Sequence, residues 1–216
     1  MKYSNGRIIF ISCVVVLLII ALVVSGTYAY FTLVVNVNNN GNIGGNTYKF
    51  DVSMDVNVIK QSTSLVPFSD DLIVDAISKT DKCVDKDGYE ICNIYKLNLT
   101  NNGNSDEILY GYVSTSNTTY VSDRLKYQVF TLNNGNYTAY TDPISVSLNT
   151  DEKVYFKKNN TLVNSSLVKG NSAEYYLVMW ISLVLEDQNE DAGKSFNGYI
   201  NFESFYGDRI TAKFSS

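Results

Sequence analysis

Apolar and polar side chains alternate along the chain between Tyr48 and Val58. Every second residue of this segment is aromatic, valine or methionine, and the residues between them are lysine, aspartate, serine or asparagine. Because successive side chains of a strand point to opposite faces of a sheet, a period of two predicts a β-strand with one buried face. The segment therefore predicts a strand at the surface of a sheet.

Similar short segments recur through the rest of the chain, separated by turn sequences at 101–104 and 133–136. The further strands are expected at 93–100, 108–116, 125–132, 137–140, 144–148, 154–156, 173–185 and 195–206. Many strands with little helical periodicity predict an all-β protein, an antiparallel β-sandwich of the jelly-roll or immunoglobulin-like kind, over residues 47–216. The strand from Tyr175 is apolar on both faces, which indicates a central position with Trp180 in the core.

One short helix interrupts this pattern. Ser69 precedes the segment 70–77, which begins with Asp70 and Asp71. A serine at the N-cap and acidic residues in the first turn both favour the start of a helix. We expect this helix to be a crossover between the two sheets, with the side chain of Ser69 as its cap.

Two cysteines flank a hairpin sequence, CVDKDGYEIC. A two-residue turn at Asp87-Gly88 would pair Cys83 with Cys92 at a position without backbone hydrogen bonds, where the two Cα atoms lie roughly 4.5 Å apart. In an exported chain such a pair predicts a structural disulfide. The alternative is a three-residue turn over Lys86, Asp87 and Gly88, which would put the two sulfur atoms out of register.

The first 29 residues are predicted to be a signal peptide or a membrane anchor. Residues 8–24 form an uncharged apolar run of seventeen residues, preceded by Lys2 and Arg7, and predict a hydrophobic helix. Small residues follow, which predicts cleavage by a signal peptidase between Ala29 and Tyr30. The alternative is an uncleaved single-pass anchor, for which the run is slightly short. In both cases the positive residues place the remainder outside the cell, either free or at the cell surface.

A second N-terminal feature follows the cleavage site. Residues 30–37, YFTLVVNV, predict a strand, and residues 38–46 form a flexible linker rich in asparagine and glycine. A tethered apolar strand either folds back onto its own sheet or pairs with the sheet edge of another copy. The second arrangement does not close on itself and predicts self-association into filaments.

The sequence GTYAYF at 26–31 resembles the ends of signal peptides that are processed by SipW-type signal peptidases. The substrates of these peptidases include the TasA and camelysin family. The segment 175–202 also resembles the last two strands of proteins that carry this signal. The resemblance implies an exported subunit of cell-surface or biofilm-matrix fibres. Camelysin is described as a metalloprotease, but that activity is not expected here because the chain contains no histidine.

Composition narrows the chemistry further. The absence of histidine excludes Ser-His-Asp and Cys-His catalysis and HExxH zinc sites, so we expect a protein without enzymatic activity or cofactor. The formal charge is -5, and loss of the cations Lys2 and Arg7 with the leader would lower it to -7. An acidic chain of this kind lacks the basic surface of a nucleic-acid-binding protein.

Two acidic loops partly match a calcium-binding loop. One contains Asp85 and Asp87, and the other, EDQNEDAGK, contains Asp187, Asn189 and Asp191. The first lacks a ligand at position one, and the second lacks the closing glutamate and has its glycine one place late. We therefore expect solvated carboxylates in turns, with a loose calcium site at 186–191 as the alternative.

Overall fold

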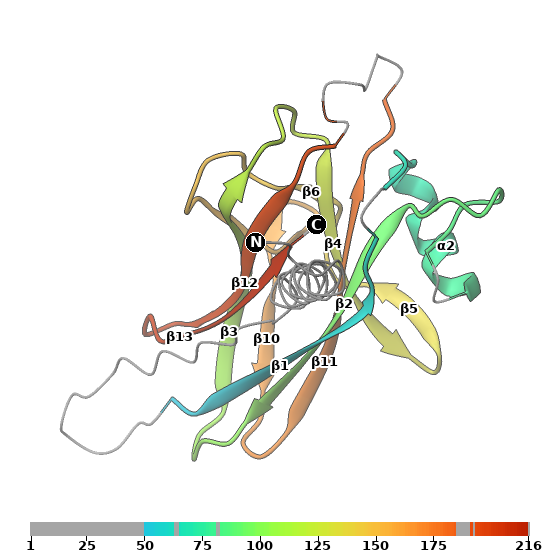
Figure 1. Ribbon diagram of the computed structural model, residues 1–216. Helices are drawn as coiled ribbons and strands as arrows, with labels where there is room; N and C mark the ends of the chain where they lie inside the picture. Colours follow the sequence, from blue (N-terminus) through green and yellow to red (C-terminus); the bar gives the residue numbers. More distant parts are fainter. Residues whose placement is uncertain (1–49, 63–64, 81–82, 185–190, 192, 216) are drawn as a thin grey trace, which may run out of the picture. The chain divides into compact units, whose positions relative to one another are not determined.

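The computed structural model describes residues 50–62, 65–80, 83–184, 191 and 193–215 (Figure 1). The chain divides into two compact units, residues 1–34 and 35–216, and the first lies wholly outside the described residues. The expected apolar helix at 8–24, the cleavage site at Ala29 and Tyr30, and the segments 30–37 and 38–46 therefore all lie outside them. The following description concerns the second unit.

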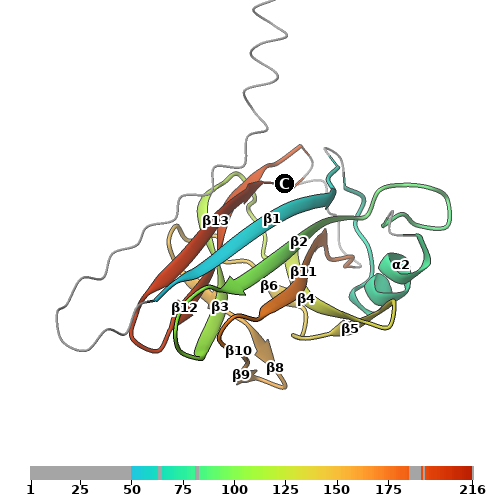
Figure 2. The same ribbon diagram turned by 90° about the horizontal axis from the view of Figure 1, so that it is seen from below.

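Residues 50–215 form two antiparallel sheets, as expected for a β-sandwich (Figures 1 and 2). The first sheet has the order β1 (Val52–Lys60), β2 (Cys92–Asn101), β11 (Ser172–Ile181), β4 (Leu125–Asn133) and β5 (Asn136–Ala139), and β6 (Ile144–Ser145) also pairs with β4. The second sheet has the order β10 (Asn164–Leu167), β3 (Glu107–Thr118), β12 (Phe196–Ser204) and β13 (Arg209–Ser215), and β7 (Lys153–Tyr155) also pairs with β3. The strands β8 (Lys157–Lys158) and β9 (Thr161–Leu162) form a small separate hairpin.

The main core lies between the inner faces of the two sheets. Tyr95 of the first sheet packs against Phe214 of the second, with their ring centroids 5.6 Å apart. Phe156 lies directly over the backbone of Gly111, where an added Cβ atom would be 2.1 Å from the ring. A side chain at Gly111 would therefore collide with the core, which explains a glycine in the middle of a strand.

A second buried cluster covers the outer face of the first sheet. The 3₁₀ turn η2 (Asp70–Leu72) leads into α2 (Ile73–Thr80), and the apolar residues of this helix pack on Phe130, Val178 and Trp180. Trp180 is fully buried on central strand β11, as expected, but beneath the helix and not between the sheets. The helix joins β1 to β2, which are neighbours in one sheet, so the expectation of a crossover between sheets is wrong.

The expected cap of this helix is also wrong. The side chain of Ser69 makes no capping hydrogen bond. Asp70 holds this segment to the sheet instead, because its carboxylate accepts a hydrogen bond from the indole Nε1 of Trp180 at 2.9 Å and pairs with Lys126. Burial raises the pKa of Asp70, but hydrogen bonds from Lys126, Trp180 and Ser182 outweigh it and hold the pKa below its usual value.

Most of the expected strands are present, with shifted ends. The Asn134-Gly135 turn between β4 and β5 has positive φ at both residues, which suits a two-residue hairpin loop. The expected strand 173–185 ends at Ile181, after which the chain forms a parallel bridge with Phe68. The short strands β8, β9 and β10 were not expected, nor was β13, the edge strand of the second sheet.

Candidate functional site

The structure joins the two cysteines of the expected hairpin. Cys83 and Cys92 form a disulfide with a Cα–Cα distance of 5.6 Å, and both residues are fully buried in the cluster beneath α2. The pairing predicted from the spacing is therefore confirmed. A sulfur pair without solvent access is structural, since thiol exchange requires an attacking thiolate to reach it.

The register that was used to predict this pairing is wrong. Val84 pairs with Glu90, and Ile91 N–H donates to the carbonyl of Cys83, so the turn contains three residues, 86–88, and not two. This is the alternative that was expected to separate the sulfur atoms. Cys83 has a left-handed φ of 45°, which redirects the chain before the hairpin and lets its side chain reach Cys92.

A side chain closes this turn. The Asp85 carboxylate accepts hydrogen bonds from the backbone N–H groups of Asp87 and Tyr89, at 2.9 and 2.8 Å. At the base of the hairpin, Glu90 pairs with Lys60 at the end of β1. The carboxylate of Asp85 is thus occupied with its own loop, as expected of an acid in a turn.

The second acidic loop differs from the expectation. Residues 185–190 and 192 lie outside the described residues, so the alternative of a calcium site at 186–191 stays a prediction. Asp191 is described, and it is buried, not solvated. Its carboxylate accepts hydrogen bonds from the backbone N–H of Val121 and the hydroxyl of Ser122. Asp191 therefore fixes the segment before β4, a role that the charge pattern did not indicate.

The free edge of β1 is the main candidate for an interaction site. Within the described part of the chain, β1 pairs only with β2. The Asn102 N–H donates to the Asp51 carbonyl at 2.7 Å, so the odd-numbered residues of β1 direct their backbone groups to β2. The backbone groups of the even-numbered residues, from Val52 to Val58, point to the open side.

The side chains of these even-numbered residues show where the core is incomplete. Val52 and Met54 point to the core and are buried, but Val58 on the same face is 47% exposed. Nearby on β2, the side-chain nitrogen of Asn93 is buried and has no hydrogen-bond partner in the part of the chain that the structure describes. Along this face, the side chains of β1 are therefore buried at the start of the strand, and Val58 near its end is exposed.

The facing strand β13 is the edge of the second sheet, and its described residues pair only with β12. Figure 2 shows β13 and β1 next to each other along one side of the sandwich. On the opposite side, the loops around the β8–β9 hairpin connect the sheets, because Asp142 N–H donates to the Lys157 carbonyl and Tyr140 donates to the Asn164 carbonyl. On the first side, the sheet edges β1 and β13 thus lie in contact, but their described residues do not pair as strands.

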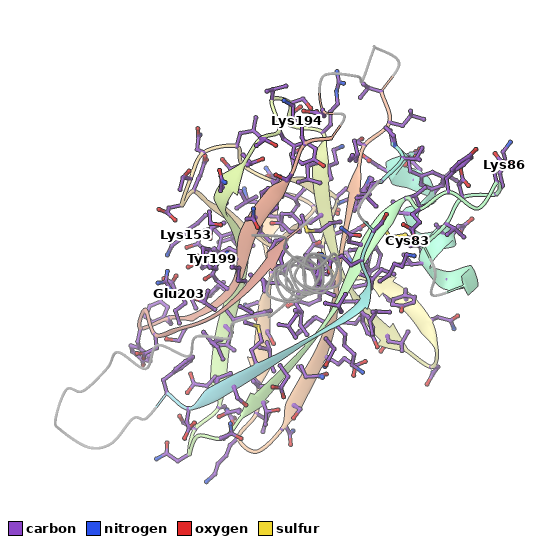
Figure 3. All side chains as sticks on the ribbon, in the orientation of Figure 1. Cys83, Lys86, Lys153, Lys194, Tyr199 and Glu203 are labelled. Atoms are coloured by element: carbon purple, nitrogen blue, oxygen red, sulfur yellow. A yellow bond between two sulfur atoms is a disulfide. The ribbon has the colours of Figure 1, made fainter. Side chains whose placement is uncertain are left out.

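The outer face of the second sheet carries a network of charges and tyrosines. Lys153 pairs with Glu203 at 2.6 Å and lies 4.9 Å from the ring centroid of Tyr112 (Figure 3). Arg209 donates to the Tyr112 hydroxyl at 3.2 Å. Burial raises the pKa of Tyr112, although Arg209 opposes the shift. These groups satisfy one another and cover Tyr112, so the network stabilises the sheet surface and presents no pair of groups arranged for acid–base catalysis.

Two further properties of the described residues bear on function. No three of their cysteine, aspartate or glutamate side chains gather as a metal-binding group. No helix among residues 50–215, as far as they are described, is long and apolar enough to cross a membrane.

Comparison with known proteins adds little. No family profile matches the chain, and no curated protein is similar to it in sequence. Among solved structures it is similar to the sporulation control protein Spo0M from Bacillus subtilis, with 5% identity and a TM-score of 0.33 over 76% of this chain and 47% of that one. It is also similar to a family 123 glycoside hydrolase from Clostridium perfringens, with 13% identity and a TM-score of 0.30 over 76% of this chain and 27% of that one. The chain thus spans less than half the length of either protein, and likenesses this distant carry no argument about function.

Proposed function

We propose that this chain is an exported, non-enzymatic β-sandwich subunit of cell-surface or biofilm-matrix fibres. Residues 30–37 of one copy pair with the free edge of β1 in the next copy. The observation that carries the proposal is this edge, where backbone groups without a partner among the described residues coincide with a core-facing valine that is half exposed. Unpaired edges of this kind are templates for the addition of a strand.

The sequence of the donated segment suits this edge. Every second residue of the segment is apolar and points to the same side of a strand, which gives one continuous apolar face of Phe31, Leu33, Val35 and Val37. A strand that adds beside β1 would place this face over the exposed side chain of Val58. The linker 38–46 lets the segment leave its own body and reach a neighbour, and the arrangement propagates because each copy both donates and accepts a strand.

The apolar segment at the N-terminus allows a second, membrane-attached form of the protein. If cleavage after Ala29 does not occur, residues 8–24 keep the body attached to the membrane, and the chain is a single-pass extracellular binding module. Cleavage by the SipW-type peptidase would then separate a tethered form from an assembling form. The uncharged apolar run at 8–24, preceded by Lys2 and Arg7, supports the existence of the tethered form.

Deletion of residues 30–37 from a secreted chain that begins at Tyr30 tests the assembly. We expect the deletion to abolish filaments in electron micrographs and to leave a folded monomer, since the segment lies outside residues 50–215. A mature wild-type protein that stays monomeric at all concentrations in sedimentation experiments would contradict the proposal.

A pair of substitutions tests the acceptor edge separately. Val58→Lys places a charge on the open edge and should prevent filaments at little cost in stability, because the side chain is already half exposed. Leu132→Lys is the matched control, since Leu132 is 39% exposed and lies on β4, away from this edge. Equal loss of filaments in both variants would show that added charge, and not the β1 edge, is responsible.

A further inference from the structure

The turn between β12 and β13 exposes two neighbouring aromatic side chains. Phe205 is 80% exposed and Tyr206 is 75% exposed, the two largest exposed fractions among the described apolar residues. Their ring centroids lie 5.7 Å apart in an edge-to-face arrangement. The rings touch each other, but most of their surface stays in water, which is unfavourable for side chains of this size.

The backbone holds this turn in one conformation. The hydroxyl oxygen of Ser204 accepts hydrogen bonds from the N–H groups of Tyr206 and Asp208, both at 3.2 Å. The Ser204 N–H donates to the Asp208 carbonyl at 2.8 Å, and Gly207 provides the positive φ of 89° that the turn requires. The two rings are therefore presented to solvent by a defined turn and not by a loose loop.

The turn lies at the end of the sandwich where β1 begins. Ser204 pairs with Leu109 near the start of β3, and the exposed Ile108 precedes Leu109. At this same end Val52, the first residue of β1, pairs with Asn101, the last residue of β2 (Figures 1 and 2). The chain that carries the apolar run 8–24 thus joins the body at the end that displays the aromatic turn.

We propose that the β12–β13 turn is a second membrane contact, in which Phe205 and Tyr206 insert into the outer lipid surface while the chain is attached through residues 8–24. This inference rests on the tethered form described above. Only 27 residues separate Val24 from Val52. A random coil of this length would span roughly 30 Å on average, so a tether of this length would keep this end of the sandwich near the bilayer. Tyrosine is enriched at the interface between lipid and water, and phenylalanine occurs among the apolar side chains that proteins bury there.

Attachment through residues 8–24 also explains why two aromatic side chains are sufficient for contact with the lipid. Two aromatic residues bind lipid only weakly from free solution, but a tether raises their effective concentration at the membrane. Contact through the turn would then hold the start of β1 and its edge beside the bilayer, and cleavage after Ala29 would release both contacts, because the turn alone does not hold the body.

Fluorescence quenching by lipid tests this contact. The full chain, with residues 8–24 intact, is reconstituted into phosphatidylcholine and phosphatidylglycerol vesicles, with and without bromine on the acyl chains. Phe205→Trp places a reporter in the turn, and Trp180, the one native tryptophan, is fully buried and serves as the background. Tyr89→Trp is the matched control, since Tyr89 is 60% exposed in the hairpin that precedes Cys92, at the other end of β2.

We expect brominated lipid to quench the emission of the Phe205→Trp variant and to leave the emission of wild type and of Tyr89→Trp nearly unchanged. If the full chain floats with the vesicles but the emission of Phe205→Trp is not quenched, the lipid contact of the turn is overturned and the tether through residues 8–24 still holds. Failure of the full chain to float contradicts both the tether and the lipid contact.

Discussion

Removal of the Cys83–Cys92 bridge is expected to cost the protein a large part of its stability. The two cysteines are nine positions apart, and a cross-link that encloses a loop of about ten residues lowers the entropy of the unfolded chain by an amount worth about 2.7 kcal/mol at 25 °C. Both sulfur atoms are buried beneath α2, so their removal also leaves a small void that adds about 1 kcal/mol. Cys83→Ala with Cys92→Ala should therefore lower the free energy of unfolding by about 3–4 kcal/mol.

The only tryptophan of the chain provides a local signal for this measurement. Trp180 lies opposite Cys92 in the pairing of β11 with β2, within the same buried cluster. Guanidinium unfolding of residues 30–216, followed by tryptophan fluorescence, gives the free energy of unfolding and the denaturant dependence for the wild type and the double variant. Mass spectrometry of the non-reduced wild type should show both cysteines linked within one chain.

A change in the turn itself serves as the control. Asp85→Ala removes the carboxylate that accepts two backbone hydrogen bonds in the same hairpin, and it should cost about 1 kcal/mol. If the double cysteine variant loses no more than Asp85→Ala, the turn closes the hairpin without the bridge and the reasoning is refuted. Two free thiols in the exported wild type would refute the pairing directly.

Two further predictions concern the core and the attachment of the helix. Gly111→Ala should lower the free energy of unfolding by about 1–3 kcal/mol, because its Cβ atom would overlap the ring of Phe156. The double variant Gly111→Ala with Phe156→Leu should lose less stability than the sum of the losses of the two single variants, as measured by thermal or denaturant unfolding. The pKa of Asp70 is held below its usual value, so its contribution to stability is complete above the pKa of an unfolded aspartate and is lost as the pH falls through the folded pKa. Melting temperatures measured at neutral and acidic pH should fall less steeply towards acid in Asp70→Asn than in wild type, and equal slopes would contradict the assigned pairing with Lys126.

Local patterns in the sequence determined the class of the fold. The alternation from Tyr48 to Val58 depends only on which face of one strand is buried; β1 forms from Val52 and follows the pattern at Val52 and Met54, whereas Val58 is exposed. The turn at Asn134-Gly135 depends only on the left-handed conformations that these two residues tolerate. The fully apolar segment at Tyr175 similarly required a central strand, because both of its faces must be covered, and β11 is central. The export signal, its cleavage and the donated strand were also read from the sequence, and they stay predictions.

Tertiary structure decided the features that depend on residues far apart in the chain. The order of the described strands places β1 and β13 at the edges of their sheets, on the same side of the sandwich, and no local pattern shows which strands take the edges. Asp191 resembles a solvated loop acid in the sequence, but Val121 and Ser122, about 70 positions away, bury it and use its oxygen atoms. Cys83 and Cys92 pair because Cys83 adopts a left-handed backbone conformation, which turn rules did not anticipate. The cost of this conformation, about one or two kcal/mol, is outweighed by the packing of the buried disulfide beneath α2. Contacts over such separations depend on the whole chain folding together, which is why these sites required the structure.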